Sequence, residues 1–283
     1  MSYKTGKWAS QIIEAQNDDG TWGQGFHTLS KPVGGRPLTT EQALRRLRIL
    51  GFTLQDEPIR RAVDYMTACL RGERKMDGSW EKTHDWPLFT QLMLSSWVKI
   101  FDPQNAPALA FANRWVRVIE TAFQSGAYDD DAYKSAYREE FDSPPKGPRE
   151  LDFSDFYHLN LLQGVISTST ESRMLDYVIN KPTCIYYVYN QPLNAPPPTW
   201  ASMQTSNYLA ALELLSGYPL AKDKLRFASD WVKANVDKNG QWDLGAKSKD
   251  GVYLPLSDSW RNAQERMADC TFRVNELLTL LMI

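Results

Sequence analysis

The sequence contains few cysteines and almost no excess of either charge, and these shortages exclude several classes of protein. Its 3 cysteines are scattered without the C-x-x-C spacing of redox and zinc sites, which argues against a disulfide framework or a structural zinc ion. The 32 basic and 34 acidic residues leave a net charge of -2, too small for long-range attraction to nucleic acid or to an anionic membrane. We therefore expect no metal ion and no nucleic acid among its partners.

Long apolar runs are also missing. No run of about eighteen apolar residues, the length that spans a bilayer, occurs in the sequence, and residues 1–8 lack the apolar core of a signal peptide. We therefore expect a soluble, cytoplasmic protein without an integral membrane segment. At 283 residues the chain exceeds the usual size of a single core, but closed helical rings reach this length as one domain. A single domain over residues 1–283 is predicted.

What the sequence does contain is a repeated motif of aspartate, glycine, a small residue and tryptophan. Residues 19–22 and 77–80 are full copies, and residues 239–242, Asn-Gly-Gln-Trp, are a weakened third copy. Glycine permits a left-handed turn after a helix, aspartate can bond the turn backbone, and tryptophan can pack over the neighbouring helix end. Each copy therefore predicts a helical hairpin joined at its Gly-Trp pair. The alternative is that Trp22 or Trp80 lines the mouth of a central cavity.

Two kinds of helix alternate along the chain. The first kind has one apolar face and is predicted near residues 4–16, 56–71, 109–123, 175–179 and 225–232. The second kind is apolar nearly all round and is predicted near residues 39–50, 88–101, 153–166, 202–216 and 268–282. This alternation predicts an all-α fold, an α/α toroid of five to six helical hairpins in two concentric layers, with residues 130–140 as the sixth pair's helix. An open superhelix is the alternative, disfavoured by the apolar C-terminus.

The motif copies and the segments between them resemble a known superfamily. The run from Trp8 to Trp22, with residues 38–44, 50–51, 59–65 and 77–80, is similar to the repeats of squalene cyclases and protein prenyltransferases. The resemblance covers best the first 80 residues and residues 200–245. It implies a toroid that holds an apolar or amphiphilic small molecule, an isoprenoid, in a central cavity. Similar rings occur in polysaccharide lyases and unsaturated glucuronyl hydrolases, which implies a sugar ligand as the alternative; a non-catalytic binding module is the third.

The aspartates of residues 129–131 depart from the catalytic pattern of that superfamily. Its cyclases use an Asp-x-Asp-Asp motif, but Tyr128 stands where the first aspartate belongs. The Asp-Asp-x-x-Asp metal motif fails at Tyr133, and the zinc ligands of prenyltransferases have no recognisable counterpart. We therefore expect these aspartates to cap a helix, with Asp130 as acid the alternative, and we expect no cofactor. Whether the protein is an enzyme, a cyclase or lyase, is left open.

Polar side chains at the starts of the more apolar helices are the candidate site, because such groups are costly unless they meet water, one another or a ligand. The candidate catalytic residues are Asp155, His158 and Asp85. Asp155 and His158 are three residues apart on a helix, so the carboxylate can orient the imidazole for acid-base work. The candidate substrate-binding residues are Glu41, Trp86, Tyr157, Trp200, Gln204, Asn207, Asp269 and Arg273.

Each candidate has a structural alternative. Asp155 would cap a helix beside a hydrogen-bonded His158, and Glu41 would be a first-turn carboxylate favoured by the helix dipole. Arg273 either pairs with Asp269, four residues earlier, or binds an anionic carboxylate or diphosphate of the substrate. In the carbohydrate alternative, tryptophans 86 and 200 would stack on sugar rings. We expect Asp155, His158 and Arg273 to converge on one cavity.

Overall fold

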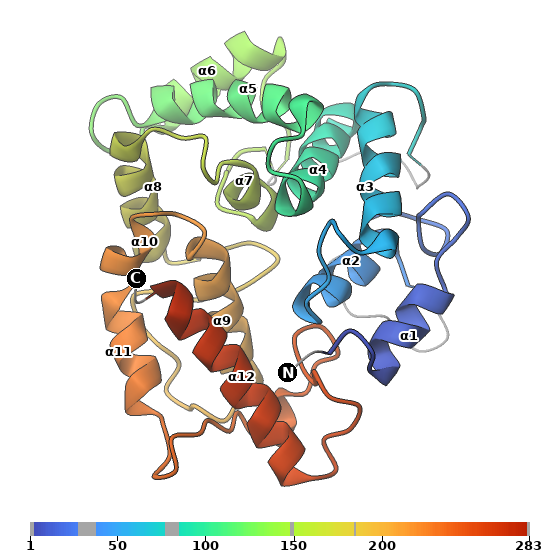
Figure 1. Ribbon diagram of the computed structural model, residues 1–283. Helices are drawn as coiled ribbons and strands as arrows, with labels where there is room; N and C mark the ends of the chain where they lie inside the picture. The colour runs from blue at the N-terminus through green and yellow to red at the C-terminus, as the bar shows by residue number, and fades with distance from the viewer. Residues whose placement is uncertain (1–2, 28–37, 77–84, 148–149, 184, 282–283) are drawn as a thin grey trace. The chain divides into compact units, whose positions relative to one another are not determined.

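The computed structural model describes residues 3–27, 38–76, 85–147, 150–183 and 185–281 (Figure 1). In this part of the chain twelve α-helices and one short 3-10 helix are linked by turns and loops, with isolated β-bridges and no strand. The all-α class predicted from the sequence is confirmed. The arrangement of the hairpins as a toroid stays a prediction.

The helices occur where the apolar periodicity predicts them, and the additional helix near residues 130–140 is also found. In chain order they are α1 (Lys7–Glu14), α2 (Thr40–Ile49), α3 (Glu57–Leu70), α4 (Trp86–Phe101), α5 (Ala106–Ala122), α6 (Asp130–Phe141), α7 (Phe156–Leu161), α8 (Thr168–Asn180), α9 (Met203–Leu215), α10 (Ala221–Lys224), α11 (Arg226–Ala234), η1 (Ala246–Ser248) and α12 (Ala263–Leu281).

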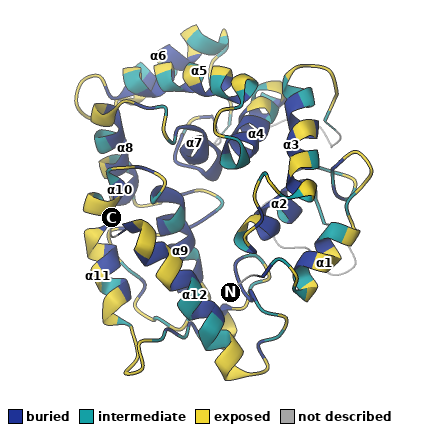
Figure 2. Ribbon diagram, viewed as in Figure 1, coloured by how far each residue is buried: buried dark blue, intermediate teal, exposed yellow. Residues whose placement is uncertain are grey.

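Burial separates the two kinds of helix, with one correction (Figure 2). All six residues of α7 are buried, whereas α1 buries only Ala9 and Ile12, as the patterns predict. Helix α12 was predicted to be buried all round, and this is wrong, because Asn275, Glu276 and Leu280 form part of an exposed face. The last residues of α12 are mostly apolar, but its exposed residues recur at helical spacing and therefore share one face.

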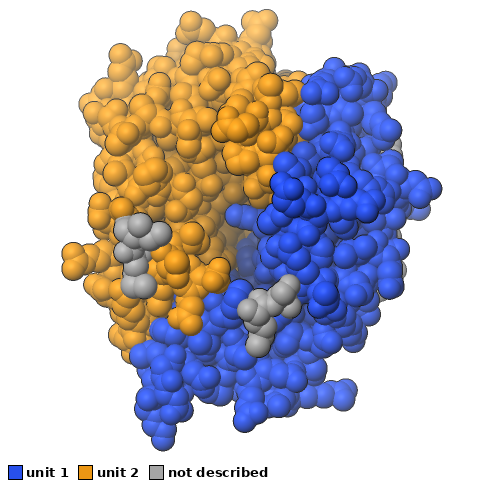
Figure 3. Space-filling view, viewed as in Figure 1, with its two compact units in different colours: residues 1–80, 199–206, 236–274 blue, residues 81–198, 207–235, 275–283 orange. Residues whose placement is uncertain are grey.

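The chain forms two compact units that alternate along the sequence (Figure 3). Unit 1 comprises Met1–Trp80, Thr199–Ser206 and Val236–Val274, and unit 2 comprises Glu81–Pro198, Asn207–Asn235 and Asn275–Ile283. Helices α9 and α12 each contribute residues to both. That residues 1–283 form a single domain stays a prediction.

The first copy of the repeated motif joins α1 to α2 in unit 1. The Nε1 of Trp22 donates to the carbonyl oxygen of Ile12 in α1 at 2.7 Å, and its backbone N–H donates to the Thr40 hydroxyl at 3.0 Å. The indole is 1% exposed. Trp22 therefore holds both helices of the hairpin, which confirms the structural role predicted for it.

Glycine and aspartate of the motif perform the roles that their chemistry predicts. Gly20 has a φ of +91°, and a Cβ there would lie 2.6 Å from the carbonyl oxygen of Arg61 in α3. A larger residue would meet both strain and a clash. The Asp19 carboxylate accepts from the Thr21 N–H at 3.0 Å and so fixes the turn.

The weakened third copy forms the same joint. The Asp237 N–H donates to the backbone carbonyl oxygen of Gln241 at 2.8 Å, and the Trp242 N–H donates to the Thr271 hydroxyl of α12 at 3.0 Å. The corresponding bonds of the first copy, from Asn17 to Thr21 and from Trp22 to Thr40, measure 2.8 and 3.0 Å. The repeat is therefore structural as well as sequential. The second copy, residues 77–80, lies outside the described residues.

One buried carboxylate anchors residues 142–147 and 150–152, the described part of a proline-rich connection in unit 2. Glu150, 1% exposed, accepts from the Asp85 N–H at 2.7 Å, from the Tyr137 hydroxyl at 2.9 Å and from the Lys146 N–H at 2.7 Å. Three donors satisfy the carboxylate in a site where an unpaired charge would be costly. The connection therefore packs onto the start of α4 and onto α6.

Lys99 of α4 is a buried cation in the same unit. Its Nζ donates to the carbonyl oxygen of Gln163 at 2.7 Å. Burial lowers the pKa of Lys99 to about 8, because removal from water disfavours the charged amine.

We predict that Trp22→Ala lowers the free energy of unfolding by about 3 kcal/mol or more, the range for truncating a buried large aromatic side chain. Trp22→Phe should cost less, since it keeps most of the packing and loses the Nε1 hydrogen bond. Urea unfolding followed by circular dichroism measures both changes. A Trp22→Ala protein as stable as the parent would disprove the role of this side chain in the joint.

We also predict a pH effect from Lys99. The unfolded chain keeps the ordinary pKa of 10.5, so between pH 8 and 10.5 the unfolded state binds more protons and stability rises with pH. Lys99→Met lacks this rise. Relative to that variant, the parent should therefore gain up to about 3 kcal/mol across the window. Urea unfolding of both proteins at pH 7.5 and pH 10 checks this, and parallel pH profiles would contradict it.

Candidate functional site

A group of buried charged side chains in unit 1 contains three of the residues predicted from the sequence. Glu41 and Asp269 are at most 1% exposed, and Arg273 is 7% exposed, as is its neighbour in this group, Arg45. Charged side chains are seldom buried so far, and each loses hydration that its partners must replace. This group is therefore the candidate site.

Two arginines stack on one tyrosine at its centre. The Cζ atoms of Arg45 and Arg273 lie 4.7 and 4.8 Å from the ring centroid of Tyr253. Arg45 also donates to the Tyr253 hydroxyl, and Arg273 donates to the hydroxyl and carbonyl oxygens of Ser206 at 2.7 and 2.9 Å. Cation–π attraction and these hydrogen bonds orient both guanidinium groups. We call Arg45, Tyr253 and Arg273 the arginine–tyrosine cluster.

Asp269 holds the chain segment that precedes α12. Its Oδ2 accepts from the N–H groups of Leu256 and Ser257, both at 2.9 Å, and from the Trp260 Nε1 at 2.6 Å. Burial, reinforced by the nearby Asp269 charge, raises the pKa of Tyr3 well above its usual value, so its hydroxyl stays protonated. The structure thus assigns Asp269 a positioning role for this segment. Its predicted pairing with Arg273 stays a prediction.

Arg46 anchors the loop that carries Tyr253. Its guanidinium group donates to the carbonyl oxygens of Val252, at 3.2 Å, and Pro255. Burial lowers the pKa of Arg46 to about 10, although Asp250 and Asp269 oppose the shift. Arg45 and Arg46, which are adjacent in α2, therefore have different roles. Arg46 holds the loop that carries Tyr253, and Arg45 contacts the ring of Tyr253.

Glu41 pairs with a histidine that the sequence did not single out. The Nδ1 of His27 lies 2.8 Å from the Glu41 carboxylate. Glu41 is also in the first turn of α2, as its structural alternative predicted. Arg45 is one of three arginines in α2, so the sequence carries no signal that separates it from Arg46 and Arg48. His27 and Tyr253 lie in irregular segments that carry no such signal.

The predicted contact between Asp155 and His158 is confirmed in unit 2. The Nδ1 of His158 lies 2.8 Å from Oδ2 of Asp155, whose Oδ1 accepts from the N–H groups of Tyr157 and His158 at 2.8 and 2.9 Å. The Nε2 of His158 has no hydrogen-bond partner among the described residues, and its ring meets Trp115 edge-on at 4.2 Å. Asp155 is thus both a helix cap and the partner of the imidazole. Their catalytic role stays a prediction.

The other candidates occupy varied places. Asp85 caps α4 by accepting from the Leu88 N–H at 3.2 Å, and Trp86 and Tyr157 pack against Phe89 in unit 2. Gln204 is exposed, and Trp200 and Asn207 are half-buried. Unit 1 holds Glu41, Trp200, Gln204, Asp269 and Arg273, and unit 2 holds Asp85, Trp86, Asp155, Tyr157, His158 and Asn207. Convergence of Asp155 and His158 with Arg273 stays a prediction.

Of the aspartates at residues 129–131, Asp129 caps α6 as expected, and the other two lie in the first turn of that helix. Asp129 accepts from the Ala132 N–H at 2.9 Å at the start of α6, and Asp130 pairs with Lys134 one turn later. This confirms the capping interpretation for Asp129.

Comparisons with protein-family models, curated protein sequences and solved structures find no match. Within the described ranges no helix is long and apolar enough to cross a membrane, and no three His, Cys, Asp or Glu side chains gather as metal ligands would. The interpretation of the arginine–tyrosine cluster therefore depends on its own geometry.

We predict that the ring of Tyr253 stabilises the fold more than its hydroxyl does. Tyr253→Leu removes the surface on which two cations stack and should cost about 2 kcal/mol or more. Tyr253→Phe keeps that surface, loses the bond from Arg45 and should cost about 1 kcal/mol. Urea unfolding of both variants measures the difference; equal losses would mean that stacking contributes little.

Proposed function

We propose that this protein binds a small amphiphilic anion, an isoprenoid diphosphate or a related terpenoid precursor, and that Arg45 and Arg273 hold its anionic head. The observation that carries the proposal is the pair of buried guanidinium groups on the Tyr253 ring. A guanidinium group presents a planar set of donors that matches phosphate and carboxylate oxygens. Two of them on one ring suit a single multivalent anion.

Limited exposure of the cluster supports a ligand rather than bulk water as its outer partner. Arg45, Arg273 and Tyr253 each keep 7–8% of their surface exposed. They are thus reachable at an edge, while most of each side chain is shielded. An ionic bond made in such a place is screened less than one on an open surface.

Aromatic side chains nearby support an apolar body for the ligand. Tyr3 packs edge-on against Phe272 at 5.3 Å, directly before Arg273 in the sequence, and Trp260 is held by Asp269. Such rings accommodate hydrocarbon and can stabilise a developing cation through their π faces. The resemblance to squalene cyclases and prenyltransferases supports the same ligand class. Cyclase or lyase activity, with Asp85, Asp155 or His158 as acid or base, is part of this proposal, supported by the 2.8 Å contact between Asp155 and His158.

Isothermal titration calorimetry with farnesyl diphosphate tests the proposal. Arg45→Met and Arg273→Met should each weaken binding at least about tenfold, because a hydrogen bond to a charged group contributes roughly 1.5–3 kcal/mol. Arg48→Met, which removes an exposed arginine of the same helix, is the matched control and should bind like the parent. Urea unfolding of each variant establishes that it is folded.

Three results would count against this function. Absence of binding to the parent would overturn it, and equal weakening in Arg48→Met would reduce it to non-specific charge attraction. Binding of galacturonate in place of farnesyl diphosphate, with the same dependence on Arg45 and Arg273, would replace the isoprenoid by a carbohydrate carboxylate.

A further inference from the structure

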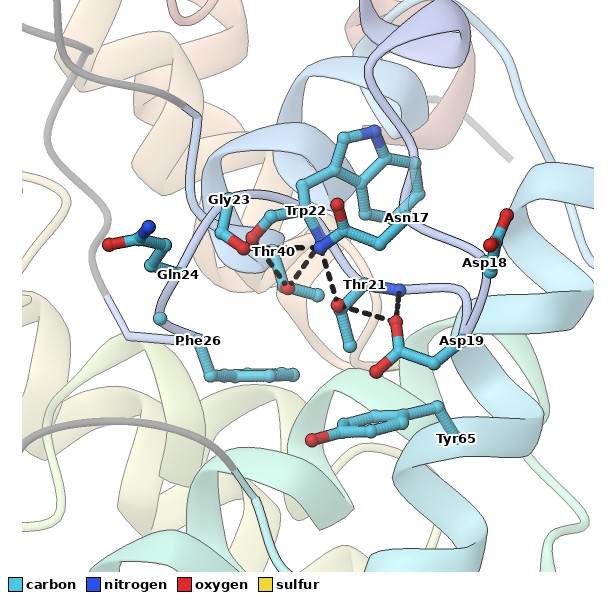
Figure 4. A pocket seen from close by; sticks show the side chains of 11 residues that line it. Asn17, Asp18, Asp19, Thr21, Trp22, Gly23, Gln24, Phe26, Thr40 and Tyr65 are labelled. Atoms are coloured by element: carbon cyan, nitrogen blue, oxygen red, sulfur yellow. Dashed lines mark hydrogen bonds between the residues drawn. The ribbon is translucent and has the colours of Figure 1, made fainter.

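A second candidate site lies on the first Gly-Trp joint, within unit 1. It is a pocket of about 460 Å³, formed by the turn at residues 17–26, by Thr40 at the start of α2 and by Tyr65 of α3 (Figure 4). This volume falls in the range of small-molecule sites. No residue of the arginine–tyrosine cluster lines it.

The floor of the pocket is aromatic and rigid. Phe26 and Tyr65 both line the pocket, and their rings are drawn below the turn in Figure 4, whereas the Trp22 indole points away toward α1. Phe26 and Tyr65 are 2 and 5% exposed. They are core side chains that offer the pocket a narrow apolar surface, and packing fixes that surface before any ligand binds.

The rim of the pocket carries both hydrogen-bond acceptors and donors. One oxygen of Asp19 accepts from the Thr21 N–H and hydroxyl, at 3.0 and 2.7 Å, which turns the carboxylate toward the aromatic floor (Figure 4). The backbone N–H groups of Gly23, Gln24 and Gly25 donate to no described residue. Gln24 adds an exposed amide group, which can donate or accept a hydrogen bond.

A Gly-Trp joint does not by itself create this pocket, because side chains fill the corresponding space in the copy at residues 239–242. Residues 23–25 correspond to residues 243–245. There Asp243 pairs with Arg266 at 2.7 Å, and Leu244 is fully buried. A Cβ on Gly245 would lie 3.2 Å from Ala201, whereas a Cβ on Gly25 would meet nothing within 4 Å. The open space of the first copy thus depends on its own residues 23–25.

The rim selects the chemistry of the ligand. Asp18 and Asp19 place two carboxylates at the pocket, which disfavours an anion, and the N–H groups of residues 23–25 disfavour a cation. A hydroxyl group donates to a carboxylate and accepts from an N–H, so it satisfies both. A sugar ring adds a face of C–H groups that can contact the aromatic floor. We propose that this pocket binds a neutral sugar residue, as a carbohydrate site separate from the anion site.

Saturation-transfer NMR and calorimetry on the full chain test this site. The probes are the methyl glycosides of glucose, galactose, mannose and xylose, with sodium glucuronate and choline chloride as the charged comparisons. At least one neutral glycoside should bind the parent with a dissociation constant in or below the millimolar range, on the order of 4 kcal/mol.

Two leucine substitutions form the matched pair of variants. Gly25→Leu places a side chain in the open space of the pocket and should weaken sugar binding at least about tenfold. Ala246→Leu places the same side chain at an exposed position of the closed copy and should leave binding unchanged. Asp19→Asn, which keeps an oxygen for the turn and replaces the free acceptor by a donor, should also weaken binding. Urea unfolding of each variant separates loss of the pocket from loss of the fold.

The outcomes separate this inference from the proposed function. Arg45→Met should bind the glycoside like the parent, and Gly25→Leu should bind farnesyl diphosphate like the parent. Failure of every neutral glycoside to bind would overturn the carbohydrate site and leave the anion site standing. Full binding by a folded Gly25→Leu protein would place the sugar outside this pocket. Preferential binding of glucuronate or choline would show that the pocket selects a charged ligand and would overturn the proposal of a neutral one.

Discussion

The hydrogen bonds between Trp22 and Thr40 are the constraint on which unit 1 depends. Thr40 accepts from the Trp22 N–H at 3.0 Å and donates back to its carbonyl oxygen at 3.4 Å. Thr39 and Gln42 form the capping box that begins α2, and the Trp22–Thr40 pair fixes the first turn of that helix against the turn at residues 17–26. Glu41 then meets His27, and Arg45, one turn further, meets Tyr253. One helix start thus positions a wall of the pocket and one arm of the arginine–tyrosine cluster.

The buried arginines of this unit have two roles: Arg46 holds a loop, and Arg45 and Arg273 stack on the tyrosine that this loop carries. Arg46 loses hydration, and its hydrogen bonds to the carbonyl oxygens of Val252 and Pro255 offset part of that cost while they hold the loop. Arg45 and Arg273 use the tyrosine that this loop presents. Their stacking depends on Arg46 indirectly, because a mobile loop could not hold the ring within reach of both guanidinium groups. A structural cation therefore supports the two that are proposed to bind a ligand.

Features encoded by local spacing could be predicted from the sequence, and those encoded by distant contacts could not. The Gly-Trp joints follow from residue types within one turn, and the Asp155–His158 contact follows from a separation of three residues. Arg45 and Tyr253, in contrast, are 208 positions apart, and Tyr253 lies in a segment without periodicity. The pocket was missed for a further reason: it depends on space beside Gly25, and no residue type signals an empty volume. The exposed face of α12 was missed because apolar content was counted without its phase.

The two described joints also explain how a repeat can carry a site without losing its structural role. Closure of each joint uses backbone groups and one glycine of the turn up to the tryptophan, together with one threonine hydroxyl from a helix further along the chain. The next three residues add backbone bonds that do not depend on their side chains: in the first copy the Gly23 carbonyl oxygen accepts from the Asn17 side chain at 3.1 Å, and the Gly25 carbonyl oxygen accepts from the Thr40 N–H at 3.3 Å. In the third copy these positions hold Asp243, which pairs with Arg266, and the buried Leu244. In the first copy they are Gly-Gln-Gly, and the space beside them is the pocket above Phe26 and Tyr65. Because these three residues bond the joint only through backbone carbonyl groups, a side chain added at Gly25 can change binding while the joint keeps its hydrogen bonds.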